Sequence, residues 1–240
     1  MTPGLLRRAA AEVLGTGVLV AAVVGSGIMA TDLTEDVGLA LLINAVSTVA
    51  ALGVLIWSLG PISGAHFNPA VTAVAWARKE IRPSEGAVYV VAQVAGALLG
   101  VALANVMFDL PAWELSTNDR VATGTLLGEV VATAGLLSLI GALTRTGRGH
   151  LGPVLVPAWI GAAYFFTAST SFANPAVTIG RAFTDTFTGI APASVAPFIA
   201  AQLVGAAIGA LLTEFFYPRR GVVPEPLDLP DPVHQPEGTS

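Results

Sequence analysis

The sequence predicts an all-α membrane protein in which six transmembrane helices and two half-helices form an inverted repeat. The first observation is composition: 54% of the 240 residues are hydrophobic and 11% are charged, whereas about 25% of the residues in a soluble domain are charged. The second is a series of six apolar runs, each long enough to cross a bilayer. The third is a ten-residue segment that occurs once in each half of the chain.

Six apolar runs of about 20 residues follow one another, and this length crosses the roughly 30 Å hydrocarbon core. They lie at residues 8–30, 37–59, 85–108, 123–144, 152–169 and 192–216. We expect one membrane domain over residues 1–218, with its two repeats at about 8–108 and 123–217. Residues 219–240 are rich in proline and acids without apolar periodicity, which is typical of a disordered tail.

The basic residues predict the orientation of the spans. If the N-terminus is cytoplasmic, nine of the eleven lysine and arginine residues lie on the cytoplasmic side. These are Arg7, Arg8, Arg78, Lys79, Arg82, Arg145, Arg148, Arg219 and Arg220. Only Arg120 and Arg181 fall outside, among acidic residues. The positive-inside rule therefore favours an even number of spans with both termini in the cytoplasm.

Two pairs of segments repeat. Residues 63–72 read SGAHFNPAVT and residues 169–178 read STSFANPAVT, while AQVAGALLG at 92–100 returns as AQLVGAAIG at 201–209. Each half holds three spans, so the second half starts on the opposite side of the membrane from the first. An inverted repeat of this kind places a path at the interface between its halves.

Each Asn-Pro-Ala motif marks the start of a short helix. The motifs are Asn68, Pro69 and Ala70 in the first half and Asn174, Pro175 and Ala176 in the second. Asparagine caps a helix and proline fits its first turn, which predicts half-helices at about 68–78 and 174–184. Each covers about 15 Å, so two that meet at the midplane cross the membrane together.

The expected chemistry at this meeting point suits neutral solutes. The side-chain amides of Asn68 and Asn174 offer N–H donors, and the irregular backbone before each motif offers carbonyl acceptors. Two helix starts facing the midplane add positive dipole ends, which repel cations. No ring of carboxylates is present to replace the hydration shell of an ion.

Several other functions find no support in the sequence. The net charge of −5 leaves no basic surface for nucleic acid, and no cysteine is present. The three histidines are far apart, so we expect no metal site and no cofactor. No nucleophile with a base lies near the motifs, which argues against an enzyme. An ion-coupled secondary transporter remains an alternative, because such proteins also have inverted repeats.

The duplicated NPAVT segment, the duplicated AQ segment and the six sorted spans resemble the major intrinsic protein family of aquaporins and aquaglyceroporins. The resemblance covers about residues 8–217 and implies a right-handed bundle that assembles as a homotetramer. It also implies a passive channel in the lipid bilayer of a bacterial inner membrane. Matching acids at Glu12 and Glu129 are then expected to brace the half-helix loops, with a proton relay as the less favoured role. His66 is expected to be a wall residue of the inner pore rather than a titrating switch.

The resemblance also assigns a selectivity filter. Most family members have an arginine directly after the second motif, where this chain has Val177. Carried over by spacing without gaps, the other filter positions are Thr48, Ala162 and Ser171, and all four side chains are small. A filter without the arginine favours solutes larger than water, such as glycerol-like polyols and neutral arsenous acid. A water-selective aquaporin remains the alternative.

Two further expectations concern Arg181 and the glycines. Arg181 lies one turn beyond Val177 and either restores a positive charge at the outer mouth or, as we favour, reaches the lipid headgroups or pairs with Asp185. The spacing Gly96-x-x-x-Gly100, with its counterpart at 205–209, suits a close helix crossing. We expect these crossings inside the protomer, where the two halves pack.

Overall fold

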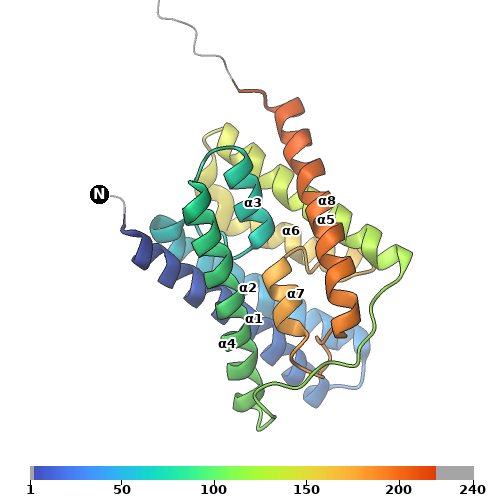
Figure 1. Ribbon diagram of the computed structural model, residues 1–240. Coiled ribbons are helices and arrows are strands. Elements are labelled where there is room, and N and C mark those ends of the chain that lie inside the picture. Colours follow the sequence, from blue (N-terminus) through green and yellow to red (C-terminus); the bar gives the residue numbers. More distant parts are fainter. Residues whose placement is uncertain (1–2, 220–240) are drawn as a thin grey trace, which may run out of the picture.

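The computed structural model describes residues 3–219, and this part of the chain is all helical (Figure 1). The long helices are α1 (Leu5–Leu33), α2 (Val37–Ser63), α4 (Pro83–Met107), α5 (Thr123–Arg145), α6 (Gly152–Phe166) and α8 (Pro192–Phe216). A short 3₁₀ turn, η1 (Gly149–Leu151), precedes α6. All six predicted spans are confirmed as helices long and apolar enough to cross a membrane. Apart from Arg219, the predicted tail at 219–240 lies outside the described residues.

The two half-helices begin where the motifs predicted and end earlier. They are α3 (Pro69–Ala77) and α7 (Pro175–Arg181), and both lie among the long helices in the middle of the bundle (Figure 1). The expected end of the second at residue 184 was wrong. The carbonyls of Ala182 and Phe183 accept hydrogen bonds from Ser116 at 3.0 Å and Glu114 at 3.1 Å. The chain turns out of the helix there because these carbonyls pair with another segment.

The glycine pairs let helices pack at backbone distance. A Cβ placed on Gly100 would lie 2.2 Å from the carbonyl oxygen of Gly17 in α1, and one on Gly209 would lie 2.5 Å from the carbonyl oxygen of Ala134 in α5. The crossings are therefore α1 on α4 and α5 on α8. They are inside the protomer as predicted, but each joins helices of one half, so the expectation that they join the two halves was wrong.

The bundle has two distinct ends. The start of α1 and the end of α8 lie at one end, called here the termini end. There Arg8 pairs with Glu85 at 2.7 Å, and Glu214 pairs with Arg145 and Arg78. The opposite end, called the far end, is crossed by the connection at 108–122 between the halves. This connection bonds to the segment after α7, for example from the backbone N–H of Ala191 to the carbonyl of Asn118 at 2.7 Å.

Candidate functional site

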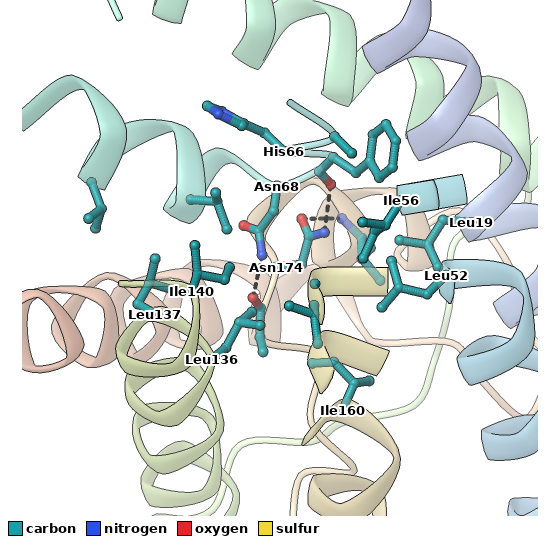
Figure 2. A pocket seen from close by; sticks show the side chains of 18 of the residues that line it. Leu19, Leu52, Ile56, His66, Asn68, Leu136, Leu137, Ile140, Ile160 and Asn174 are labelled. Atoms are coloured by element: carbon teal, nitrogen blue, oxygen red, sulfur yellow. Dashed lines mark hydrogen bonds between the residues drawn. The ribbon is translucent and has the colours of Figure 1, made fainter. Parts of the chain in front are cut away.

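A cavity of about 320 Å³ runs along the bundle between the halves. Its wall includes Arg78 and Thr144 near the termini end, Asn68 and Asn174 in the middle, and Arg181 near the far end. Most of the remaining wall is aliphatic (Figure 2). The aliphatic residues labelled there are Leu19, Leu52, Ile56, Leu136, Leu137, Ile140 and Ile160. The two half-helices thus begin beside the middle of a largely apolar passage.

The two motif asparagines face each other in this passage (Figure 2). Asn68 Nδ2 donates to the carbonyl of Ala173 at 2.7 Å, and Asn174 Nδ2 donates to the carbonyl of Phe67 at 2.8 Å. Each asparagine therefore bonds to the loop of the other half, which ties the two half-helices together. An amide nitrogen carries two hydrogens, so each side chain keeps one N–H for a molecule in the cavity.

The asparagine oxygens are occupied by the helices they begin. Asn68 Oδ1 accepts from the backbone N–H of Ala70 at 2.9 Å, and Asn174 Oδ1 accepts from Ala176 at 3.0 Å and from Val177 at 3.3 Å. Prolines follow both caps at the first helical position, where a missing N–H has no cost. Capping leaves each side chain as a donor toward the cavity.

The loop before each asparagine has a strained backbone. Ala65 and Phe67 have φ values of 50° and 47°, and the matching Ser171 and Ala173 have 54° and 47°. A left-handed conformation costs a non-glycine residue on the order of 1–3 kcal/mol, so surrounding contacts must hold it. The same strain occurs at matching positions of both loops, where each loop turns the chain into a half-helix inside the bundle.

Two buried glutamates supply those contacts. Glu12 accepts hydrogen bonds from the backbone N–H groups of His66 at 3.0 Å and Phe67 at 2.7 Å, as well as from Ser63 Oγ and Gln93 Nε2. The carboxylate is fully buried, and several charge-assisted bonds make such burial tolerable.

The second glutamate repeats this arrangement. Glu129 accepts from the backbone N–H groups of Phe172 at 2.9 Å and Ala173 at 2.8 Å, and from Gln202 Nε2 at 2.6 Å. Gln93 and Gln202 come from the duplicated AQ segments, which explains why those segments repeat. Neither glutamate belongs to the cavity wall.

His66 lies in the cavity wall on the termini side of Asn68. Its Nδ1 is 3.0 Å from Thr72 Oγ1, and its ring meets the edge of Tyr89 at 5.3 Å between centroids. Phe172 occupies the matching place in the second half and meets Phe198 at 5.2 Å in the same way. Sequence reasoning missed Phe172, although its alignment with His66 in the repeated segment could have identified it.

Three of the four expected filter residues line the cavity, and one does not. Thr48, Ser171 and Val177 are buried in the wall. Ala162 is exposed on α6 and is absent from the wall, so its assignment is corrected.

Helical geometry explains the error at residue 162. On α6 the wall residues follow one another at four-residue spacing on one face, namely Gly152, Val156, Ile160 and Tyr164. Ala162 is turned about 200° from both Ile160 and Tyr164. The filter position carried over from the family without gaps therefore fell on the wrong face of α6. Tyr164 also donates to Thr48 Oγ1 at 3.3 Å, so this part of the cavity is not built from small side chains alone.

Arg181 does not reach outward as favoured. It is 4% exposed, lies in the cavity wall, and places its guanidinium 3.4 Å from the centroid of the Phe172 ring. Asp185, the expected partner, instead accepts from the backbone N–H of Thr117 at 2.8 Å. Both favoured explanations of Arg181 were wrong, because the segment after α7 folds back over the half-helix and Thr188 binds the arginine through its carbonyl.

Comparisons with known proteins agree with this architecture. A sequence model of the family described as "Major intrinsic protein" matches residues 1–173. Aquaglyceroporin AqpS from Rhizobium meliloti (strain 1021) is 51% identical over 220 residues, which cover 91% of this chain and 94% of that relative. Aquaporin Z from Photorhabdus laumondii is 33% identical over 169 residues, covering 63% of this chain and 72% of that protein.

A solved structure shares the fold. The X-ray structure of the aquaglyceroporin from Plasmodium falciparum matches with a TM-score of 0.62 and 22% sequence identity, covering 90% of this chain and 96% of that one. The predicted fold class is thus confirmed. Given the family match over most of its length, the chain belongs to the major intrinsic protein family.

Proposed function

We propose that this integral membrane protein is a passive channel for small uncharged solutes, namely glycerol-like polyols, neutral metalloid acids such as arsenous acid, and water. One observation carries the proposal. Asn68 and Asn174 each present an amide N–H to a cavity whose walls are otherwise largely aliphatic. A neutral hydroxylic solute can accept these hydrogen bonds without losing a large hydration energy, whereas an ion cannot.

The family and the placement of the buried acids argue against an enzyme and against an ion-coupled transporter. Members of the major intrinsic protein family are channels and not enzymes. An ion-coupled transporter needs ionisable groups that a coupling ion can reach. Glu12 and Glu129 are fully buried outside the cavity wall and bond to the loops, which favours a structural role as braces. The position of these two acids therefore favours a passive channel over an ion-coupled transporter.

A broad solute range is favoured over strict water selectivity. The relative that is 51% identical carries the name aquaglyceroporin. Val177 adds no charge to the cavity wall beside Asn174, and we propose that Val177, Thr48 and Ser171 belong to the filter. The family resemblance associates the loss of the filter arginine with larger solutes, including arsenous acid.

We also propose how the channel is placed in the cell. The termini end carries most of the arginines, among them Arg8, Arg78, Arg145 and Arg148, so the positive-inside rule favours a cytoplasmic termini end. A bacterial relative supports location in a bacterial inner membrane. The homotetramer is an expectation from the family resemblance, and chemical crosslinking in liposomes tests it.

Solute flux into proteoliposomes tests the main proposal. Stopped-flow light scattering under glycerol, arsenite and mannitol gradients gives the permeability to each solute and to water relative to empty liposomes. We expect water, glycerol and arsenous acid to enter without saturation and without any dependence on an ion gradient. Fast water flux with exclusion of glycerol and arsenite favours the water-selective alternative, and ion-dependent saturable uptake favours the transporter.

A further inference from the structure

Arg181 is the last residue of α7 and lies inside the cavity wall, one helical turn beyond Val177. The matching residue of the first half-helix is Ala75, which also lines the cavity. The inverted repeat is therefore broken at this pair of positions. A positive charge is present near the far end of the passage, while the equivalent place toward the termini end holds a methyl group.

The guanidinium of Arg181 is held on two sides. Its carbon Cζ lies 3.4 Å from the centroid of the Phe172 ring, which is a cation–π contact. Its Nε donates to the carbonyl of Thr188. Arg120 steadies the same loop by donating to the carbonyls of Gly189 at 2.6 Å and Phe187 at 3.0 Å. Within residues 3–219, Arg181 is thus fixed in place by a ring and a carbonyl, without an ion pair.

The two Nη atoms of Arg181 are free. Within residues 3–219 they have no hydrogen-bond partner in the protein, and no carboxylate lies within ion-pair distance. Neither Nη atom is fully buried. Since Arg181 lines the cavity, its four terminal N–H donors are available to a molecule inside it.

A second polar group in this part of the wall is unpartnered. Ser171 is 3% exposed, and its Oγ has no hydrogen-bond partner among the described residues. It precedes Phe172, the residue on which Arg181 stacks, and it lines the same cavity. A buried hydroxyl without a partner is costly unless a mobile molecule satisfies it.

We propose that Arg181 and Ser171 form a solute-binding subsite near the far end of the cavity, which favours neutral solutes with several hydroxyl groups and excludes cations. This inference rests on the proposed channel function. The guanidinium donates to solute oxygens and the serine hydroxyl accepts a solute O–H, so a polyol or a neutral hydroxyl acid satisfies both. The guanidinium has no ion-pair partner within residues 3–219, and its positive charge in a mostly apolar passage repels cations.

The test compares solutes of similar size that differ in hydroxyl content. The permeabilities to glycerol and to propane-1,2-diol are measured in proteoliposomes after subtraction of empty-liposome flux, together with proton leak reported by an internal pH dye. For Arg181→Gln we expect the glycerol-to-diol ratio to fall by roughly tenfold, as for loss of a charged hydrogen bond, and proton leak to rise. Arg181→Lys keeps the charge without the planar fork, so it should retain proton exclusion and lose much of the ratio.

Two further variants make the test decisive. Arg148→Gln removes the same charge from an exposed site at the termini end and should leave both readouts unchanged. Ser171→Ala removes only a hydroxyl that has no hydrogen-bond partner within residues 3–219, so it should fold even where Arg181→Gln does not. We expect it to lower the ratio by about threefold, which is typical of one neutral hydrogen bond.

The outcomes separate this proposal from the proposed function. If Ser171→Ala, or a stably folded Arg181→Gln, retains the wild-type ratio and proton exclusion, the subsite is wrong although the channel stands. If the wild-type protein passes none of these solutes faster than empty liposomes do, the channel function itself is wrong.

Discussion

Val177 lies in the cavity wall directly after the second Asn-Pro-Ala segment and is 5% exposed. Thr48, Tyr164 and Ser171 line the same cavity, and Tyr164 donates to Thr48. A larger side chain at residue 177 therefore has no free volume except the passage itself. At the scale of single residues, we therefore expect residue 177 to limit the size of the solute that can pass, and we expect no such effect from Ala162 on the outer face of α6.

A matched pair of substitutions tests this distinction. Val177→Arg should lower glycerol and arsenite permeability by roughly tenfold, equivalent to about 1.4 kcal/mol in the permeation barrier, while water flux persists. Ala162→Leu should leave all three permeabilities at the wild-type level, because the added side chain points away from the cavity. Stopped-flow measurements normalised to inserted protein check both. Unchanged solute entry in Val177→Arg would falsify the filter position.

At the scale of elements, the half-helix loops depend on acids from other helices. Glu12 of α1 and Glu129 of α5 each bond to two consecutive backbone N–H groups of the loop before an Asn-Pro-Ala motif. These loops contain non-glycine residues in the left-handed region. Their shape is therefore imposed by the carboxylates rather than by local preference.

We expect Glu12→Gln and Glu129→Gln to lower thermal stability in detergent markedly, by about 3 kcal/mol each, because an amide cannot accept from all the donors that face a buried carboxylate. Glu35→Gln, at an exposed site, is the control and should change nothing. A wild-type melting temperature in both brace variants contradicts the role of these acids.

Helix crossings at the element scale give another test. Gly100→Ala places a methyl 2.2 Å from the carbonyl oxygen of Gly17 and forces α1 and α4 apart, so it should destabilise the protein by about 1–3 kcal/mol. Gly60→Ala, at a helical site where the new methyl meets no atom of another segment within 4 Å, should cost clearly less than Gly100→Ala. Equal unfolding temperatures for the two variants contradict the close packing.

At the scale of the whole molecule, the connection at 108–122 joins the halves and covers the far end. Two aspartates fasten it. Asp119 accepts from Val121 N–H and Ser194 Oγ, and Asp185 accepts from Thr117 N–H. The N–H of Val121 and then the Ser194 hydroxyl lower the pKa of Asp119 below 3.8, and the N–H of Thr117 does the same for Asp185.

These lowered pKa values predict a pH dependence. A carboxyl whose folded pKa is below its unfolded value stabilises the protein above about pH 4, and this contribution is lost as pH falls through the folded pKa. Asp185→Asn should therefore be less stable than wild type at pH 6, and the difference should shrink toward pH 3. Asp109→Asn, which lacks such contacts among the described residues, should follow wild type. A difference in melting temperature that is as large at pH 3 as at pH 6 contradicts this account.

Local patterns in the amino-acid sequence were enough to predict the six spans, the two half-helix starts and the polar residues of the candidate site. Apolar run length, asparagine before proline and internal duplication are local signals, and each reports directly on the physics of a bilayer or of a helix start. Asn68, Asn174, Glu12 and Glu129 were identified because each has a counterpart in the other half.

Which side chains face the passage became clear only from the packing of the helices. Whether Ala162 or Tyr164 lines the cavity depends on the rotation of α6 about its axis, and an apolar helix in a membrane carries little sequence signal for that rotation. Likewise, Arg181 is turned inward by the ring of Phe172 and the carbonyl of Thr188. Those contacts arise only when the segment after α7 folds back, so spacing alone pointed to Asp185 instead.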